Sequence, residues 1–287
     1  MVGQGGGDDV TAYQATLRGV TFGADTVYEH AEAPAGFGVP DIRSGDVPIP
    51  RGDGVIAGDD FLAARVVVFD LWVLGDTDVD VEASARSLKA AFAPSREDIE
   101  LVVALSGDPV SYSLFGRPRG CELSLAFLPQ GVGRVRAVFL ATDPRLLAAE
   151  STAGISLPAG SAGLVFPADA PFAFGALSSS GEAIVSNTGT VDADWTATID
   201  GPVVGPRIEW VEGGVLLSLP SLTVPAGDTL EFDSRTRSVM LDGSASRYSS
   251  LSTVSRWWRL PPGDSTIRYR AVSGSGGLTF RHRPASL

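Results

Sequence analysis

The stretch "SRWWRLPPGD", residues 255–264, places two tryptophans side by side and follows them at once with a double proline. Successive side chains of a β-strand point to opposite faces, so a strand here would separate the two tryptophans. We expect Trp258 and Leu260 to share one face, with Trp258 anchoring a buried core, and Trp257 to cover the outside or an interface. The prolines remove backbone donors and therefore end the strand.

Short strands of this kind recur about every ten residues through the second half of the chain. They cover residues 182–187, 193–200, 207–212, 214–219, 229–234, 238–242, 255–260, 266–272 and 278–283. The residues expected to shape the turns between them are Asn187, Gly189, Gly201, Gly205, Pro206, Pro262 and Gly263. A Gly-, Ala-, Ser- and Pro-rich stretch at 151–163 marks a domain boundary. We therefore predict an antiparallel β-sandwich over residues 151–287.

The first half of the chain mixes strands with one helix. An apolar stripe predicts the helix over residues 80–93, with Asp80 as its N-cap and Pro94 as its stop. The stripe comprises Val81, Ala85, Leu88 and Phe92. Apolar or alternating runs predict strands within residues 11–30, 62–75, 99–107, 119–129 and 134–144. The chain is thus predicted to be mainly β with one helix, and residues 1–150 to form an α+β domain.

Two segments of this first domain lack a regular pattern. The glycine-rich residues 1–10 are interpreted as a flexible arm, without the features of a signal peptide. Residues 34–60 are rich in Pro, Gly and Asp throughout, and the segment is too long for a simple turn. We interpret it as a long loop or irregular arm.

Composition narrows the class of protein. A single cysteine, Cys121, excludes an intramolecular disulfide, and two histidines argue against a histidine-based metal site. The longest apolar stretch, residues 66–75, is too short to span a bilayer and contains Asp70. We predict a soluble protein made in a cytoplasm, with no membrane partner.

The net charge of −12 argues against general nucleic-acid binding. The charge is unevenly distributed, because residues 234–287 carry nine arginines against two aspartates, a net +7, and the remainder carries −19. Such asymmetry suggests complementary surfaces within an assembly or toward a partner.

Motifs for catalysis are missing from the sequence. There is no phosphate-binding loop of the Gly-x₄-Gly-Lys-Ser/Thr type and no Gly-x-Ser-x-Gly nucleophile elbow. Paired carboxylates at 59–60 and 78–82 suit helix capping and solvation better than glycoside hydrolysis. We predict no enzyme activity, no catalytic residue, no cofactor and no metal site.

Four segments in order resemble the distal tail protein family of long-tailed (siphovirus-type) bacteriophages. "VFLATDPRLLAAE" (138–150) is similar to the junction between the two domains of that family. "VSNTGTVDADWTATIDGPVVGPRIEW" (185–210) and "GDTLEFDSRTRSVMLDG" (227–243) resemble the opening of the second domain and a following hairpin. "RWWRLPPGDSTIRYR" (256–270) resembles its aromatic-x-Leu-x-Pro-Gly-Asn element, with Asp264 where Asn is commoner.

The resemblance implies an N-terminal α+β domain that closes into a ring, usually hexameric, and a C-terminal galectin-like β-sandwich outside it. It implies a structural part of the virion at the distal end of the tail, in the baseplate or tail tip, assembled in the host cytoplasm. The implied partners are other copies of the chain, the major tail (tube) protein, the tape-measure protein and the tail-tip hub, with DNA only in transit. Residues 34–60 then become a candidate arm to a neighbouring subunit.

Two alternatives concern the second domain. A lectin-like module for host adhesion would use Trp195, Trp210 or Trp257 as an exposed aromatic beside polar groups. The arginines of the last strands could instead bind nucleic acid, but docking onto an acidic protein neighbour is favoured because acids predominate elsewhere. The residues expected to face a partner are Trp257, Arg268, Arg270, Arg281 and Arg283.

Overall fold

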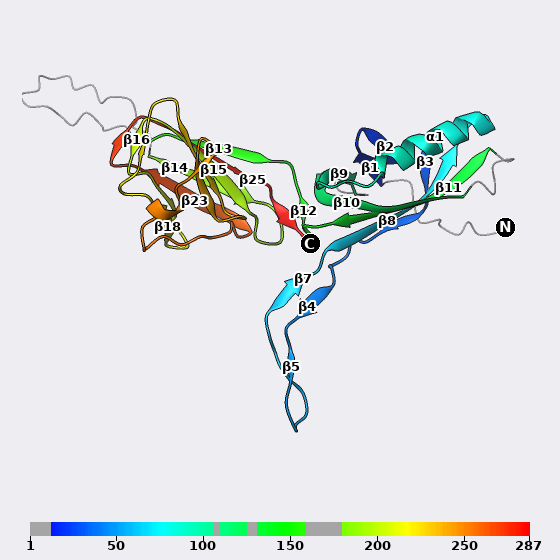
Figure 1. The fold of residues 1–287 in the computed structure, drawn as a ribbon, viewed down its shortest axis with the longest axis horizontal. Helices are drawn as coiled ribbons and strands as arrows, with labels where there is room; N and C mark the ends of the chain where they lie inside the picture. The colour runs from blue at the N-terminus through cyan, green and yellow to red at the C-terminus, as the bar shows by residue number, and fades with distance from the viewer. Residues whose placement is uncertain (1–12, 106–109, 125–130, 159–179) are drawn as a thin grey trace, which may run out of the picture. The chain divides into compact units, whose positions relative to one another are not determined.

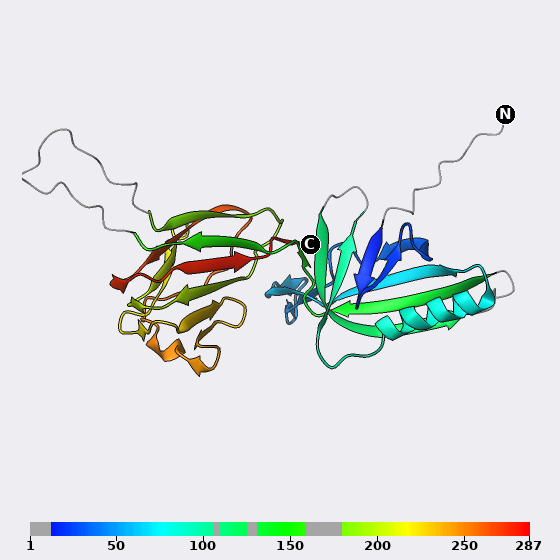
Figure 2. The same ribbon diagram turned by 90° about the horizontal axis from the view of Figure 1, so that it is seen from above.

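The computed structural model describes residues 13–105, 110–124, 131–158 and 180–287. The chain divides into two compact units, one made of residues 1–149 with 286–287 and one of residues 150–285. Nearly all regular structure in the described residues is antiparallel strand, with a single α-helix (Figures 1 and 2). The prediction of a mainly β protein with one helix is confirmed. The expected flexible arm at 1–10 lies outside the described residues.

The first unit is built on an antiparallel sheet with the strand order β2-β1-β9-β10-β11-β8-β3. Its strands are β1 (Gln14–Leu17), β2 (Val20–Gly23), β3 (Tyr28–Ala35), β8 (Arg65–Leu74), β9 (Ile99–Ala104), β10 (Ser111–Ser124) and β11 (Val132–Ala141), and β12 (Leu146–Leu147) pairs with β10. Residues 11–30 therefore hold β1, β2 and the start of β3, more strands than the one or two expected. Tight turns at Arg18–Gly19 and Asp25, all with positive φ, fit the extra reversals into this stretch.

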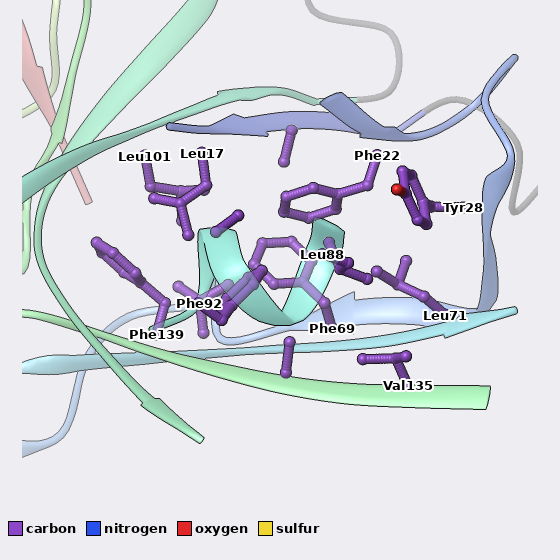
Figure 3. Close-up of a cluster of buried hydrophobic side chains, with 14 of the residues drawn as sticks. Leu17, Phe22, Tyr28, Phe69, Leu71, Leu88, Phe92, Leu101, Val135 and Phe139 are labelled. Carbon is purple, nitrogen blue, oxygen red and sulfur yellow. The ribbon is translucent and has the colours of Figure 1, made fainter. Parts of the chain in front are cut away.

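Helix α1 (Asp78–Ala91) covers one face of this sheet and closes the core (Figure 3). All four residues of the predicted stripe are buried, and Phe22, Phe69 and Phe92 pack together beneath the helix. The predicted N-cap was wrong. Thr77 caps the helix, because its hydroxyl accepts a hydrogen bond from Asp80 N at 3.3 Å and donates to Asp80 Oδ2 at 2.7 Å.

Between β3 and β8 the chain forms an extended arm, residues 36–63 (Figure 1). An arm was expected here, but it is more regular than predicted, since it contains two short antiparallel ladders. β4 (Ile42–Ser44) pairs with β7 (Asp60–Leu62), and farther out β5 (Val47–Pro48) pairs with β6 (Val55–Ile56). Arg51 and Gly54 take positive φ at the tip, where the chain reverses.

The second unit holds three antiparallel sheets. The largest has the order β13-β25-β15-β20-β21-β22, the next β14-β23-β17-β18, and the smallest β19-β16-β24. The bounds are β13 (Ser151–Ile155), β14 (Glu182–Asn187), β15 (Trp195–Asp200), β16 (Val203–Val204), β17 (Arg207–Trp210), β18 (Val215–Ser218), β19 (Thr223–Val224), β20 (Thr229–Asp233), β21 (Ser238–Leu241), β22 (Ala245–Ser246), β23 (Gly263–Arg270), β24 (Ser273–Gly274) and β25 (Leu278–His282). A 3₁₀ turn (Tyr248–Ser250) follows β22, and β26 (Ala285–Ser286) ends the series.

The two larger sheets each bury one set of alternating side chains, as the layers of a sandwich do. Likeness of this unit to galectins stays a prediction.

The strand expected over residues 255–260 was wrong. Only Leu260 makes a bridge, to Ala193, and the preceding residues run irregularly along β18. The hydroxyl of Ser255 accepts the hydrogen bond from Ser218 N at 3.1 Å and replaces a strand carbonyl there. Ladder pairing is lost because a side chain has taken the place of the backbone partner.

Candidate functional site

The arm carries an unusual share of the exposed apolar surface. Seven of the sixteen exposed large hydrophobic residues in the described chain lie within its 28 residues. They are Val39, Ile42, Val47, Ile49, Val55, Ile56 and Phe61. A two-stranded ribbon is only marginally stable by itself in water, and apolar side chains exposed along its length suit a protein interface.

A buried arginine ties the base of the arm to the sheet. Arg65 is 2% exposed, and its guanidinium donates to the carbonyls of Gly36 at 2.6 Å, Gly38 at 2.7 Å and Pro144 at 2.7 Å. These bonds join the first residues of the arm to Pro144, which lies between β11 and β12. Burial lowers the pKa of Arg65 from its ordinary value. Reasoning from sequence missed this residue, although its position in phase with the buried Val67 and Phe69 was a signal.

The face of the first sheet opposite α1 has no helix over it in the described residues. Arg134 organises this face by donating to Asp70 at 3.0 Å and Glu32 at 3.4 Å, with its guanidinium 5.2 Å from the ring centre of Trp72. Val66 lies on the same face and is 49% exposed. The first unit therefore presents two surfaces suited to protein contacts, the arm and this open face.

The predicted turn residues of the second unit lie where the chain makes close contacts. Asn187 is buried; its amide donates to Val191 O and Leu260 O, and its carbonyl accepts from Gly189 N and Ala285 N. Gly205 and Gly263 adopt the positive φ values that favour glycine, +62° and +93°. Pro206 is buried and Pro262 is exposed, directly before β23.

Gly189 and Gly201 are needed for a different reason from the one expected. Neither has positive φ, but a Cβ on Gly189 would lie 1.9 Å from Ala285 O, and one on Gly201 would lie 1.7 Å from Pro225 O. Both positions therefore require glycine, because a neighbouring backbone segment lies too close for any side chain.

The tryptophans form a packed cluster. Trp258 is 7% exposed, and its ring lies 4.7 Å from the ring of Trp195 at a tilt of 37°; Trp195 donates from Nε1 to Trp258 O at 3.1 Å. Trp257 is half-buried with its ring 6.1 Å from Trp195. Trp210 is half-buried as well, and Trp195 is buried, so neither Trp195 nor Trp258 can serve as an exposed sugar platform.

The arginines expected to face a partner are largely paired within the second unit. Arg268 bonds Glu182 at 2.7 Å and lies 3.6 Å from Glu209, and Arg270 bonds Glu182 at 3.3 Å. The hydrogen bond from Arg268 is the main cause that lowers the pKa of Glu182. These contacts satisfy the two arginines locally and weaken the expectation of an acidic docking partner. Arg281 lies 3.9 Å from Glu150, and Arg283 is half-buried.

Two further features are absent from the described residues. No group of three or more His, Cys, Asp or Glu side chains there could hold a metal ion. No helix in the same part of the chain is long and apolar enough to cross a membrane.

Known proteins resemble this chain in two ways, through a family model that matches part of the second unit and through solved structures of similar fold. Residues 188–284 match the family model of the siphovirus-type tail component, C-terminal domain. The crystal structure of the Dit protein of phage SPP1, a paradigm of the hub adsorption apparatus in phages that infect Gram-positive bacteria, is similar with a TM-score of 0.66 and 16% identity. That similarity covers 96% of this chain and 99% of the SPP1 protein.

The activated baseplate of phage P2 with calcium is similar with a TM-score of 0.49 and 8% identity, over 93% of this chain and 97% of the matched one. No curated protein sequence matches the chain. Residues 188–284 thus match the model of the siphovirus-type tail component family, and the chain as a whole shares the fold of the SPP1 Dit protein.

Proposed function

We propose that this chain is a structural component of a bacteriophage tail tip, a distal tail protein whose copies associate into a ring. The ring, hexameric in the proposal, joins the tail tube to the tail-tip hub and adsorption apparatus and lets DNA pass. Its contacts are other copies of itself, the tail tube protein, the tape-measure protein and the hub. The role is mechanical and needs no enzyme activity.

The observation that carries the proposal is the apolar arm anchored by Arg65. Burying even half of its seven exposed large side chains would contribute on the order of 5 kcal/mol to an interface. The anchor holds the base of the arm in place, which lowers the ordering cost of binding. A second copy is a natural partner, because its open sheet face offers the exposed Val66 to the arm, and cyclic symmetry then closes a ring.

The experiment is light scattering of the purified protein together with class averages from negative-stain images. Six copies would weigh about 179 kDa, six times 29.8 kDa, and should form closed rings with a central hole. The variant Ile42→Ser/Ile56→Ser/Phe61→Ser should lose the ring and keep its fold, since all three side chains are exposed.

A matched control changes three exposed hydrophobic residues of the second unit, Ile184→Ser/Val254→Ser/Val272→Ser, and should leave the mass unchanged. A 29.8 kDa monomer at every concentration of the unaltered protein would contradict self-association. Equal loss of the ring in both triple variants would contradict the role of the arm.

A further inference from the structure

The six-stranded sheet of the second unit has a hollow of about 320 Å³ on one face. It is lined by Thr196, Ala197, Thr198, Glu231, Phe232, Asp233, Ser238, Met240 and Arg281. Its size lies at the lower end of the range for small-molecule sites, roughly 300–1,000 Å³. We refer to it as the sheet hollow.

Strand register places the polar lining in two rows across neighbouring strands. In the first row Arg281 of β25, Thr196 of β15, Asp233 of β20 and Ser238 of β21 lie opposite one another in turn. The second row consists of Thr198, Glu231 and Met240. The hollow therefore offers a guanidinium at one side, carboxylates in the middle and hydroxyls throughout.

Several of these groups have unused hydrogen-bonding capacity. Thr196, Thr198 and Glu231 make no side-chain hydrogen bond within the described residues, and Arg281 has only a long ion pair, 3.9 Å, to Glu150. Asp233, by contrast, is held in place, because its Oδ1 accepts from Arg235 N at 2.8 Å and Thr236 N at 3.2 Å. The hollow thus combines a fixed carboxylate with free donors and acceptors.

We propose that the sheet hollow binds a neutral oligosaccharide. Each sugar hydroxyl both donates and accepts, which suits a lining where carboxylates accept, a guanidinium donates and threonine hydroxyls do either. The methyl groups of the threonines and the side chain of Met240 offer apolar contact to the C–H face of a sugar ring. Two carboxylates against one guanidinium disfavour a phosphorylated or sulfated glycan, since its anion would meet Glu231 and Asp233.

This site differs from the one expected from tryptophans, none of which line the hollow. It also does not depend on ring formation, because all its residues come from one sheet of one copy. Failure of the oligosaccharide test would leave the mass measurement above unaffected.

The test is a panel of neutral oligosaccharides built from glucose, galactose, rhamnose or N-acetylglucosamine, with phosphorylated and sulfated counterparts of the same sugars. Binding to the full chain is measured by calorimetric titration. We expect at least one neutral member to bind, and Glu231→Gln and Thr198→Val each to weaken its binding about tenfold or more, the size expected when a hydrogen bond to a charged or buried group is lost.

The control variant is Thr188→Val, which removes an exposed threonine hydroxyl outside the hollow and should bind as the unaltered protein does. Thermal unfolding of each variant checks that the sheet is intact. The proposal is overturned if no neutral sugar binds, if anionic counterparts bind more tightly, or if Glu231→Gln and Thr198→Val bind as tightly as Thr188→Val.

Discussion

Arg65 shows how one side chain can position a whole element. Its guanidinium is buried, has no carboxylate partner among the described residues, and donates to three carbonyls from two distant parts of the chain. We expect Arg65→Met to lower the free energy of unfolding by at least about 2 kcal/mol, because buried acceptors lose their donors. Urea titration measures this change, and limited proteolysis within residues 36–63 should become faster.

The control for Arg65 is Arg43→Met in the arm. Arg43 is exposed and makes no side-chain hydrogen bond within the described residues, so its replacement should change stability by no more than about 0.5 kcal/mol. Similar losses for both variants would show that the anchor contributes nothing specific.

Residue 189 must be glycine because the backbone of Ala285 leaves no room for a side chain. In Gly189→Ala the new methyl would meet the backbone oxygen of Ala285, which cannot move without disturbing its bonds to Thr190 N and Val191 N. We expect a loss of about 2 kcal/mol or more in the free energy of unfolding. Gly154→Ala is the matched comparison, because nothing lies within 4 Å of its Cβ position and its φ is not positive. An equal effect at both sites would refute the steric explanation.

At the scale of the element, helix α1 depends on a cap that lies three residues before the predicted one. Thr77→Ala removes the hydroxyl that accepts from Asp80 N and should cost about 1 kcal/mol, measured by denaturant unfolding. Ser87→Ala, on the exposed side of the same helix, should be neutral or slightly stabilising because alanine is the better helix former. If Thr77→Ala is neutral too, the helix does not rely on this cap.

For the arm, the sequence predicts where the segment lies but not which strands form within it. Its position could be predicted from the density of Pro, Gly and Asp over residues 34–60, but its two ladders could not. Strands of two or three residues are too short to show alternation, and their pairing depends on where the chain reverses.

At the scale of the whole molecule, each unit has its own buried core. We therefore expect a fragment of residues 150–287 to fold alone and to unfold cooperatively, as followed by circular dichroism and thermal scanning. The same fragment with Trp195→Ala should lose this transition or unfold at a much lower temperature, since that side chain is 1% exposed at the centre of the tryptophan cluster. An unstructured fragment without the substitution would contradict the independence of the unit.

From the sequence alone one could predict the mainly β character with one helix, the stripe that α1 buries, and the resemblance of the second half to siphovirus-type tail components. These properties follow from local periodicity and from motifs that are contiguous in the chain. The burial of Trp258 also agrees with the expectation, although the strand meant to carry it does not form.

Which polar groups meet could not be predicted without the three-dimensional fold. Arg65 bonds a carbonyl 79 residues away, and Arg268 and Arg270 find Glu182 more than 80 residues away. The sheet hollow likewise appears only when β25, β15, β20 and β21 lie side by side. Strand order and register are set by packing between distant segments, and a side chain's partners change whenever the register changes.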